Sequence, residues 1–84
     1  MSFRSVVLDE ISEERDHQLR KWGEQTHDPA WWYVILGEEF GEAGREIFEH
    51  NDKRLREELI QVAAVAVAWL EDIDGRSVSD HSRH

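Results

Sequence analysis

The chain has 84 residues, a formal net charge of −9 at pH 7 and no cysteine. This length allows one domain, and so short a domain buries only about 60% of the surface that its unfolded chain exposes, which makes association with a second copy an obvious further source of stability. The charge repels the phosphates of nucleic acids and anionic membranes, and the lack of cysteine excludes disulfides and thiolate zinc sites.

The sequence carries no signal for a membrane or for export. No apolar run approaches the ~20 residues that span a bilayer. The N-terminal stretch MSFRSVVLDE turns acidic too early for a signal peptide. We therefore expect a cytoplasmic protein that binds neither nucleic acid nor membrane.

A first helix is predicted over about residues 3–21, which contain no glycine or proline. We expect Gly23 to end this helix and the stretch GEQTHDP to form a loop. Arg15 can belong to the packed face because its aliphatic stem lies along apolar surface while its head stays wet. The residues that recur at helical spacing are Leu8, Ile11, Arg15, Leu19 and Trp22.

A second helix is predicted over about residues 29–49. Asp28 before Pro29 is typical of a capping residue followed by proline at the first helical position. One stripe of this helix is predicted to face the core. Its members are Trp32, Leu36, Phe40, Ala43 and Ile47.

Three glycines, Gly37, Gly41 and Gly44, share one flank of the second helix. Each costs ~1 kcal/mol relative to alanine in a helix interior. They are either tolerated defects or places where another helix approaches closely, and we favour the close approach.

A third helix is predicted over about residues 53–73, capped by Asn51 or Asp52 and ending at Asp74-Gly75. Residues 59–70, LIQVAAVAVAWL, are apolar nearly all the way round, which is typical of a helix buried on most sides. Two partner helices do not enclose it easily. We therefore expect an all-α fold whose antiparallel helices form a four-helix-bundle-like core in a homodimer or homotetramer. Residues 1–75 would form the single domain and 76–84 a disordered tail.

Acidic side chains recur at matching positions on the second and third helices. Glu39 and Glu42 lie at the border of the core stripe, with Glu38 further round the helix. Glu58 and Gln61 repeat the spacing at a similar height if the two helices pack antiparallel. Hard oxygen ligands suit Mg²⁺, with Mn²⁺ also possible. The alternative is a solvated acidic face, because 19 of the 84 residues are acidic.

These segments resemble the signature of the MazG-like, all-α nucleoside triphosphate pyrophosphohydrolases, EExxE followed after a variable spacer by EExxD. Here EEFGE at 38–42 is followed after 14 residues by EELIQ at 57–61. The stretch RDHQLRKWGEQTHDPAWWYVILGEEFGEA is also similar to a segment of small MazG-like proteins, including many from phages. The resemblance covers about residues 8–74.

The resemblance implies hydrolysis of an NTP or dNTP to the monophosphate and pyrophosphate. It assigns metal binding to Glu39, Glu42 and Glu58, and makes Glu38 the carboxylate that activates water or a further ligand. The family's last acid falls at Gln61, whose amide oxygen can still bind Mg²⁺ but carries no charge. This departure leaves open the number of metal ions and the rate of hydrolysis.

Candidate substrate contacts surround the predicted loop. Lys21 is either a phosphate contact or a surface charge, and the two glutamines are suited to hydrogen-bond a base edge. A tryptophan can stack on a base, a contact worth ~1–3 kcal/mol; the family resemblance favours Trp22. The histidine either contacts substrate or closes the loop. The candidates are Gln18, Lys21, Trp22, Gln25, His27 and Trp31.

Two other classes of function remain compatible with the sequence. The first is a non-catalytic helical module that binds nucleotides or regulates a partner, and Gln61 motivates it. The second is an acidic helical dimer without a small ligand, which predicts no thermal shift with Mg²⁺ and nucleotide.

Overall fold

The computed structural model describes the backbone of residues 2–82 and the side chains of residues 2–77. It contains three helices, α1 (Phe3–Trp22), α2 (Pro29–Phe48) and α3 (Asp52–Ser82). No strand occurs among the described residues, which confirms the predicted all-α class. None of these helices is long and apolar enough to cross a membrane.

The ends of α1 follow from capping chemistry. The Ser2 side chain accepts a hydrogen bond from the Ser5 N–H at 3.1 Å, and so satisfies one of the unpaired donors of the first turn. At the other end Gly23 has φ 74°, and its N–H donates to the Leu19 carbonyl at 2.9 Å. Glycine suits this left-handed conformation because it has no Cβ. The predicted end at Gly23 is therefore confirmed.

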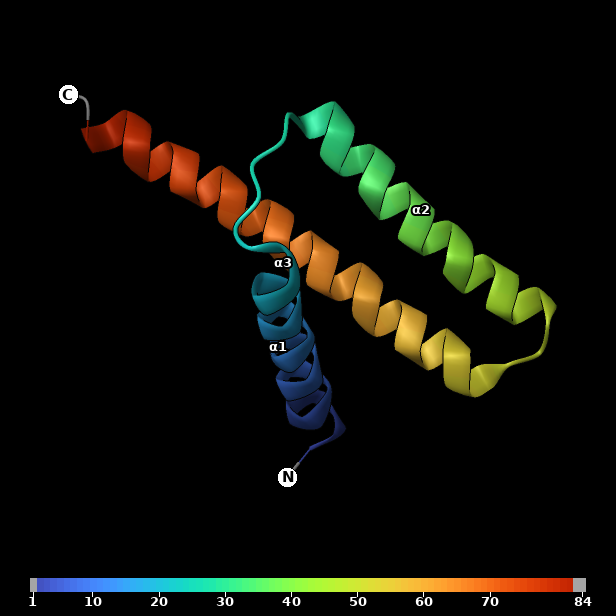
Figure 1. The fold of residues 1–84 in the computed structure, drawn as a ribbon. Helices are drawn as coiled ribbons and strands as arrows, with labels where there is room; N and C mark the ends of the chain where they lie inside the picture. Colours follow the sequence, from blue (N-terminus) through green and yellow to red (C-terminus); the bar gives the residue numbers. More distant parts are fainter. Residues whose placement is uncertain (1, 83–84) are drawn as a thin grey trace.

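The start of α2 and the turn to α3 use the expected residues. Asp28 accepts a hydrogen bond from the Trp31 N–H at 2.8 Å, and Pro29 occupies the first turn. The Asn51 side chain accepts from the Arg54 N–H at 3.1 Å, so Asn51 caps α3. His50, with φ 57°, makes the reversal between the two helices. This short turn makes α2 and α3 antiparallel neighbours (Figure 1).

The predicted end of α3 at Asp74-Gly75 is wrong, because the helix continues to Ser82. A glycine ends a helix when it adopts a positive φ, and Gly75 does not. Because the helix continues, Arg76 lies one turn after Asp72, and its guanidinium lies 3.1 Å from the Asp72 carboxylate. The expected disordered tail is thus helical from residue 76 to 82, and residues 83–84 lie outside the described part.

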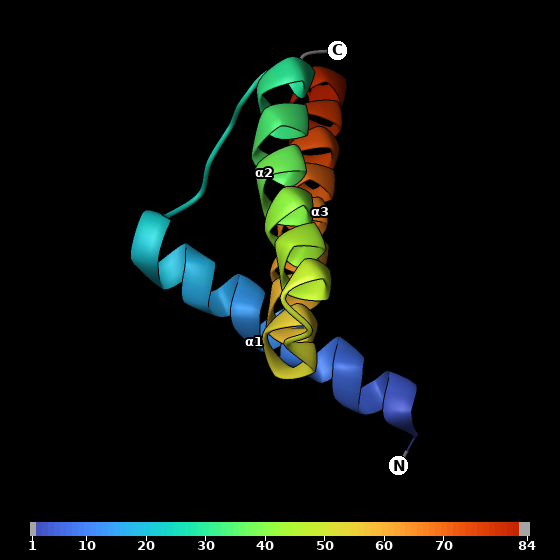
Figure 2. The ribbon, with the colours of Figure 1, turned by 90° about the vertical axis from the view of Figure 1, so that its right-hand side faces the viewer.

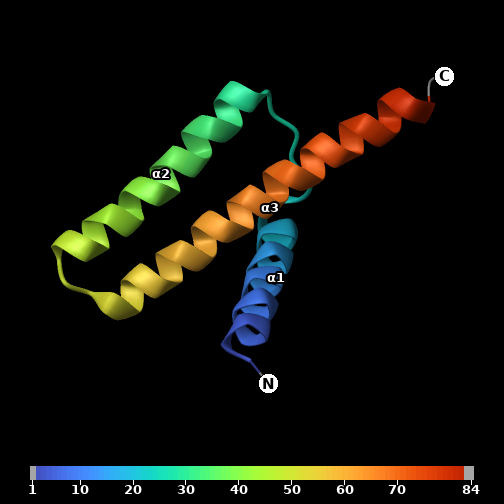
Figure 3. The ribbon, with the colours of Figure 1, turned by 180° about the vertical axis from the view of Figure 1, so that it is seen from behind.

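Helix α3 is the element on which the other two pack. Among the described residues, α1 and α2 each pack on α3 and not on each other. Figures 1 and 3 show α2 alongside α3 and α1 crossing α3 steeply on a different side. Figure 2 shows the 23–28 loop bridging the distance between α1 and the start of α2. The molecule is accordingly elongated, with extents of 52 × 33 × 21 Å.

The core is small and lies between α2 and α3. Its buried residues include Trp32, Val65 and Ala68, with Trp69 stacked on Trp32 at 6.4 Å between ring centroids. No large side chain is fully buried among the described residues. A core of this size is marginal for one copy, as expected for so short a chain.

The predicted core stripe of α2 is correct for Trp32 and Ala43 but wrong for Phe40 and Ile47, which are 67% and 61% exposed. A single neighbouring helix covers only a narrow strip of α2. Compared with the predicted stripe, the covered strip lies further round the helix, toward the edge that carries the half-buried Glu39. The position of α3 therefore brings an acidic edge inward and leaves two large apolar side chains outside.

Alanine substitution tests the backbone conformations of Gly75 and Gly23. Gly75→Ala should stabilise the protein by ~1 kcal/mol, because an ideal Cβ at this helical position meets no atom within 4 Å. Gly23→Ala should destabilise it by ~1 kcal/mol or more, because alanine is strained at positive φ. Urea unfolding of both variants measures the difference. A loss of stability in Gly75→Ala would contradict the extended α3.

Candidate functional site

Three carboxylates converge where α2 faces α3. One carboxylate oxygen of each of Glu39, Glu42 and Glu58 lies within 4.8 Å of those of the other two. Glu39 and Glu42 share a side of α2 because they are three residues apart. Glu58 reaches them because the turn at 49–51 places it opposite on α3. The three residues predicted as acidic metal ligands are thus brought together.

Burial and like charge both act on this acidic triad. Burial raises the pKa of Glu39, and the negative charges of Glu42, Glu38 and Glu14 raise it further. Burial also raises the pKa of Glu58, with Glu42 as the next cause. The Glu58 Oε2 atom is buried and has no hydrogen-bond partner among the described residues. Three hard oxygen donors with an unsatisfied buried lone pair fit a divalent cation such as Mg²⁺.

The other two predicted members of the acidic site lie differently. Glu38 is exposed and outside the triad. Gln61 turns toward α1, where its Nε2 donates to Glu14 Oε1 at 2.6 Å. Sequence reasoning missed Glu14, although its position between Ile11 and Gln18 on one helical row gave a signal that it faces inward.

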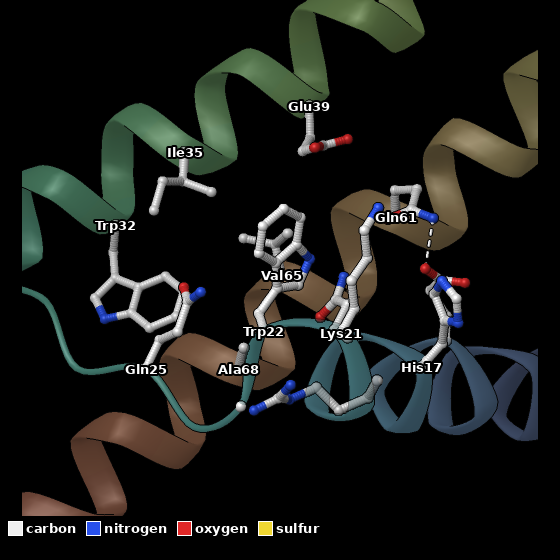
Figure 4. A pocket seen from close by; sticks show the side chains of 14 residues that line it. His17, Lys21, Trp22, Gln25, Trp32, Ile35, Glu39, Gln61, Val65 and Ala68 are labelled. Atoms are coloured by element: carbon white, nitrogen blue, oxygen red, sulfur yellow. Dashed lines mark hydrogen bonds between the residues drawn. The ribbon is translucent and has the colours of Figure 1, made fainter.

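A cavity of about 440 Å³ opens beside the triad, between α1, α2 and α3. Figure 4 shows Trp22 and Lys21 rising from the end of α1 toward α2, with Glu39 descending from α2. Six residues predicted for the site line this cavity. They are Gln18, Lys21, Trp22, Gln25, Glu39 and Gln61. The remaining lining comes from Glu14, Arg15, His17, Gly23, Trp32, Ile35, Val65 and Ala68.

The cavity combines groups of different chemistry. Lys21 Nζ lies 4.9 Å from the centroid of the Trp22 ring, so a cation and an aromatic face are presented together. Ile35 from α2 and Val65 from α3 supply apolar lining. Glu39 belongs both to the lining and to the acidic triad. The cavity therefore has an aromatic and basic part that adjoins an acidic one.

His27 and Trp31, also predicted to contact substrate, do not line this cavity. Trp31, in the first turn of α2, is about half exposed. The His27 ring packs edge-on against Trp32 at 4.9 Å, and its Nε2 lies 3.0 Å from Gln25 Oε1. His27 thus holds the loop and reaches the cavity through Gln25.

A buried carboxylate on α3, Asp72, fastens this loop. Its Oδ2 accepts from the Trp32 indole N–H at 2.8 Å and from the His27 backbone N–H at 3.2 Å. Arg76 donates to Asp72 Oδ1 at 3.1 Å and to the His27 carbonyl at 2.6 Å. The indole N–H, ahead of the other partners, lowers the pKa of Asp72. Sequence reasoning missed this residue, and the Asp72–Arg76 spacing of four was the available signal.

Two ion pairs fix α1 on α3. Arg15 Nε donates to Glu71 Oε1 at 2.7 Å, and the Arg15 side chain is mostly buried, as its place on the packed row implied. Arg56 donates through both terminal nitrogens to Glu10, at 2.6 and 2.8 Å. These contacts keep the Lys21 end of α1 at the cavity.

Comparisons with protein-family models, with curated proteins and with solved structures each found no match to this chain. The MazG-like resemblance therefore stays a prediction from the two acidic motifs and the stretch that precedes them.

Neutralising Glu58 should stabilise the metal-free protein. Its folded pKa lies above the usual 4.5, so its contribution to stability is fully present below pH 4.5 and is lost as pH rises through the folded pKa. The Glu58→Gln variant has no charge at this position at any pH, so it avoids this loss of stability. It should melt at a higher temperature than wild type at pH 7 in EDTA. Thermal unfolding by circular dichroism from pH 4 to 8 measures it.

The matched control for this experiment is Glu49→Gln, at an exposed glutamate in the turn after α2. It should change melting little at any pH. An unchanged or lower melting temperature of Glu58→Gln in EDTA at pH 7 would contradict the repulsion assigned to the triad.

Asp72→Asn should lower the melting temperature at neutral pH. The folded pKa of Asp72 lies below the usual 3.8, so its contribution is present above pH 3.8 and is lost as pH falls through the folded pKa. The difference from wild type should therefore shrink in acid. Asp74→Asn, at an exposed aspartate two residues away, is the control and should behave like wild type. Equal melting temperatures of Asp72→Asn and Asp74→Asn at pH 7 would contradict the proposed role of Asp72 in holding the loop.

Proposed function

We propose that the protein is a Mg²⁺-dependent nucleotide pyrophosphohydrolase, which converts an NTP or dNTP and water to the monophosphate and pyrophosphate. The observation that carries this proposal is the double position of Glu39. It belongs to a triad of carboxylates within 4.8 Å of one another and also lines the neighbouring cavity. A triphosphate whose base lies in the cavity would extend its phosphates toward the acidic side chains.

The cavity suits the base and sugar of a nucleotide. Its volume of about 440 Å³ lies within the usual range of small-molecule sites. The Trp22 ring is largely exposed, so a base can stack on it, a contact worth ~1–3 kcal/mol. Gln18 and Gln25 offer amide donors and acceptors to the base edge, and Lys21 offers a cation to a phosphate.

The acidic side chains suit the reacting end. Glu39, Glu42 and Glu58 would hold Mg²⁺, or Mn²⁺. Gln61, whose amide nitrogen donates to Glu14 on α1, would become a neutral fourth ligand only through its amide oxygen. The ion would supply the positive charge that a chain of net charge −9 lacks and that phosphoryl transfer requires. Glu38, exposed beside Glu39, would accept the proton of the attacking water or act as a further ligand.

We also propose that the protein works in the cytoplasm as a homodimer or homotetramer with a four-helix-bundle-like core. Support comes from the exposure of large apolar side chains on all three helices, which a small core leaves uncovered. Leu59 and Leu70, within the segment expected to be buried on most sides, are about half exposed in one copy.

A second candidate function is a nucleotide-binding or regulatory module without catalysis. The observation that favours it is the hydrogen bond from Gln61 to Glu14, which commits the amide to α1 where the family signature has an acid. Such a protein would bind Mg²⁺ and nucleotide through the same residues and release no pyrophosphate.

Glu39→Gln should abolish pyrophosphate release from NTPs and dNTPs and weaken Mg²⁺ binding by at least ~100-fold, because even groups behind a metal ligand contribute ~10–100-fold. Pyrophosphate assays with a panel of nucleotides and calorimetric titration with Mg²⁺ measure the two effects separately. Glu49→Gln is the control and should match wild type in both. If wild-type protein binds Mg²⁺ but releases no pyrophosphate from any nucleotide, the proposed pyrophosphohydrolase activity is refuted.

Gln61→Asp separates the two candidate functions. A weakly active or inactive wild type whose aspartate variant gains turnover indicates that the amide limits catalysis. An active wild type that the substitution leaves unchanged indicates a tolerated ligand. Nucleotide binding without turnover in both proteins favours the regulatory module.

A further inference from the structure

An exposed side of α2, next to the strip that packs on α3, carries a regular apolar seam. Its six residues alternate at spacings of three and four, the pattern with which one helix packs along another. Small and large side chains each recur every seven residues. The small ones are Ala30, Gly37 and Gly44, and the large ones are Tyr33, Phe40 and Ile47. We call these six residues the α2 seam.

Nothing in the described part of the chain covers the seam. Tyr33 is 71% exposed, and Phe40 and Ile47 are exposed to a similar extent. An ideal Cβ built at Gly37 or Gly44 meets no atom within 4 Å. Figures 1 and 3 show α3 along one side of α2, and α1 does not pack on α2. The close helix approach expected at the glycines is therefore not made within one copy.

The seam is also free of charge, as are the residues that flank it on the outer side, Val34, Gly41 and Phe48. Two copies that each carry a net charge of −9 repel one another, so contact is favoured where no carboxylate has to be buried. An exposed, uncharged strip of this length on so acidic a protein marks an interaction site.

We infer that the α2 seam binds the same seam of a second copy, with the two α2 helices antiparallel. The inference builds on the proposed homo-oligomer and names its contact. In an antiparallel pair, one register places all six seam residues opposite one another. Ala30 then faces Ile47, Tyr33 faces Gly44, and Gly37 faces Phe40, and each pair occurs twice about the two-fold axis.

Volume explains why the antiparallel arrangement is favoured. In the register given above, every layer joins one small and one large residue, so the layers have similar volumes and the helices approach closely at the glycines. In a parallel pair with matched ends each residue would face its own copy. Gly37 would meet Gly37 and leave a void, whereas Phe40 would meet Phe40 and force the helices apart.

The area available is sufficient for a stable contact. Tyr33, Phe40, Ile47 and the flanking Phe48, which is 86% exposed, together offer roughly 600 Å² per copy at the usual size of such side chains. Complete coverage of these side chains in both copies would bury about 1,200 Å² in total, at the lower limit of stable interfaces.

Leucine at the glycines tests the seam without disturbing one copy. A Cβ at Gly37 or Gly44 meets no atom within 4 Å in the single chain, and leucine favours the helix more than glycine does. Each leucine would face a large side chain in two layers of the pair, which should raise the dissociation constant at least ~100-fold. Sedimentation equilibrium at several concentrations should show a dimer become a monomer, or a tetramer become a dimer. Gly75→Leu, an equally open glycine on α3, is the control and should associate as wild type.

A volume swap tests the register. Gly37 and Phe40 share a layer in the proposed pair, so Gly37→Leu combined with Phe40→Ala restores its volume and should recover association to within ~10-fold of wild type. In a register shifted by seven residues the two changes fall in different layers and add. Circular dichroism confirms that each variant remains helical.

A wild type that is monomeric at all concentrations would overturn both the homo-oligomer and the seam. A wild-type oligomer that Gly37→Leu and Gly44→Leu leave intact would overturn the seam alone. Dissociation by both leucine variants without recovery in the swap would overturn the register.

Discussion

The packing of both other helices on α3 is the constraint from which the rest of the molecule follows. Because α1 and α2 do not pack on each other, a cavity opens between them, with α3 as its floor. The loop that joins them has no regular structure of its own. Asp72 therefore decides where the loop lies, since its carboxylate holds both the loop backbone and Trp32.

The same packing concentrates negative charge. A single neighbouring helix covers one edge of α2, and that edge carries acidic residues opposite Glu58. The raised pKa values of Glu39 and Glu58 show that the protein bears an electrostatic cost there in the absence of a cation. Glu46, also buried and with a carboxylate oxygen that has no partner among the described residues, raises the pKa of Glu58 further through its charge. Structural stability and the proposed binding of Mg²⁺ would thus be opposed at the triad.

Because the chain is short, the apolar side chains that pack on α3 form only a small core. Many other large apolar side chains stay exposed. The triad residues of α2 and its exposed large apolar residues occupy different sides of the helix. One side faces α3 and carries the triad, and the other carries the α2 seam. Helix α2 would therefore connect a proposed catalytic site with a proposed contact between copies through a single rigid element.

Local sequence signals determined where the helices begin, their caps and the three members of the acidic triad. Gly23, Asp28 and Asn51 act on their own turns, and Glu39, Glu42 and Glu58 are brought together by helical spacing and a short turn, so no distant contact was needed. The tertiary structure decided the rest. Gly75 stays helical because Arg76 finds partners in Asp72 and the distant His27 carbonyl. Phe40 faces outward because burial depends on which neighbour a helix has, and periodicity gives the faces of a helix without saying which one is covered.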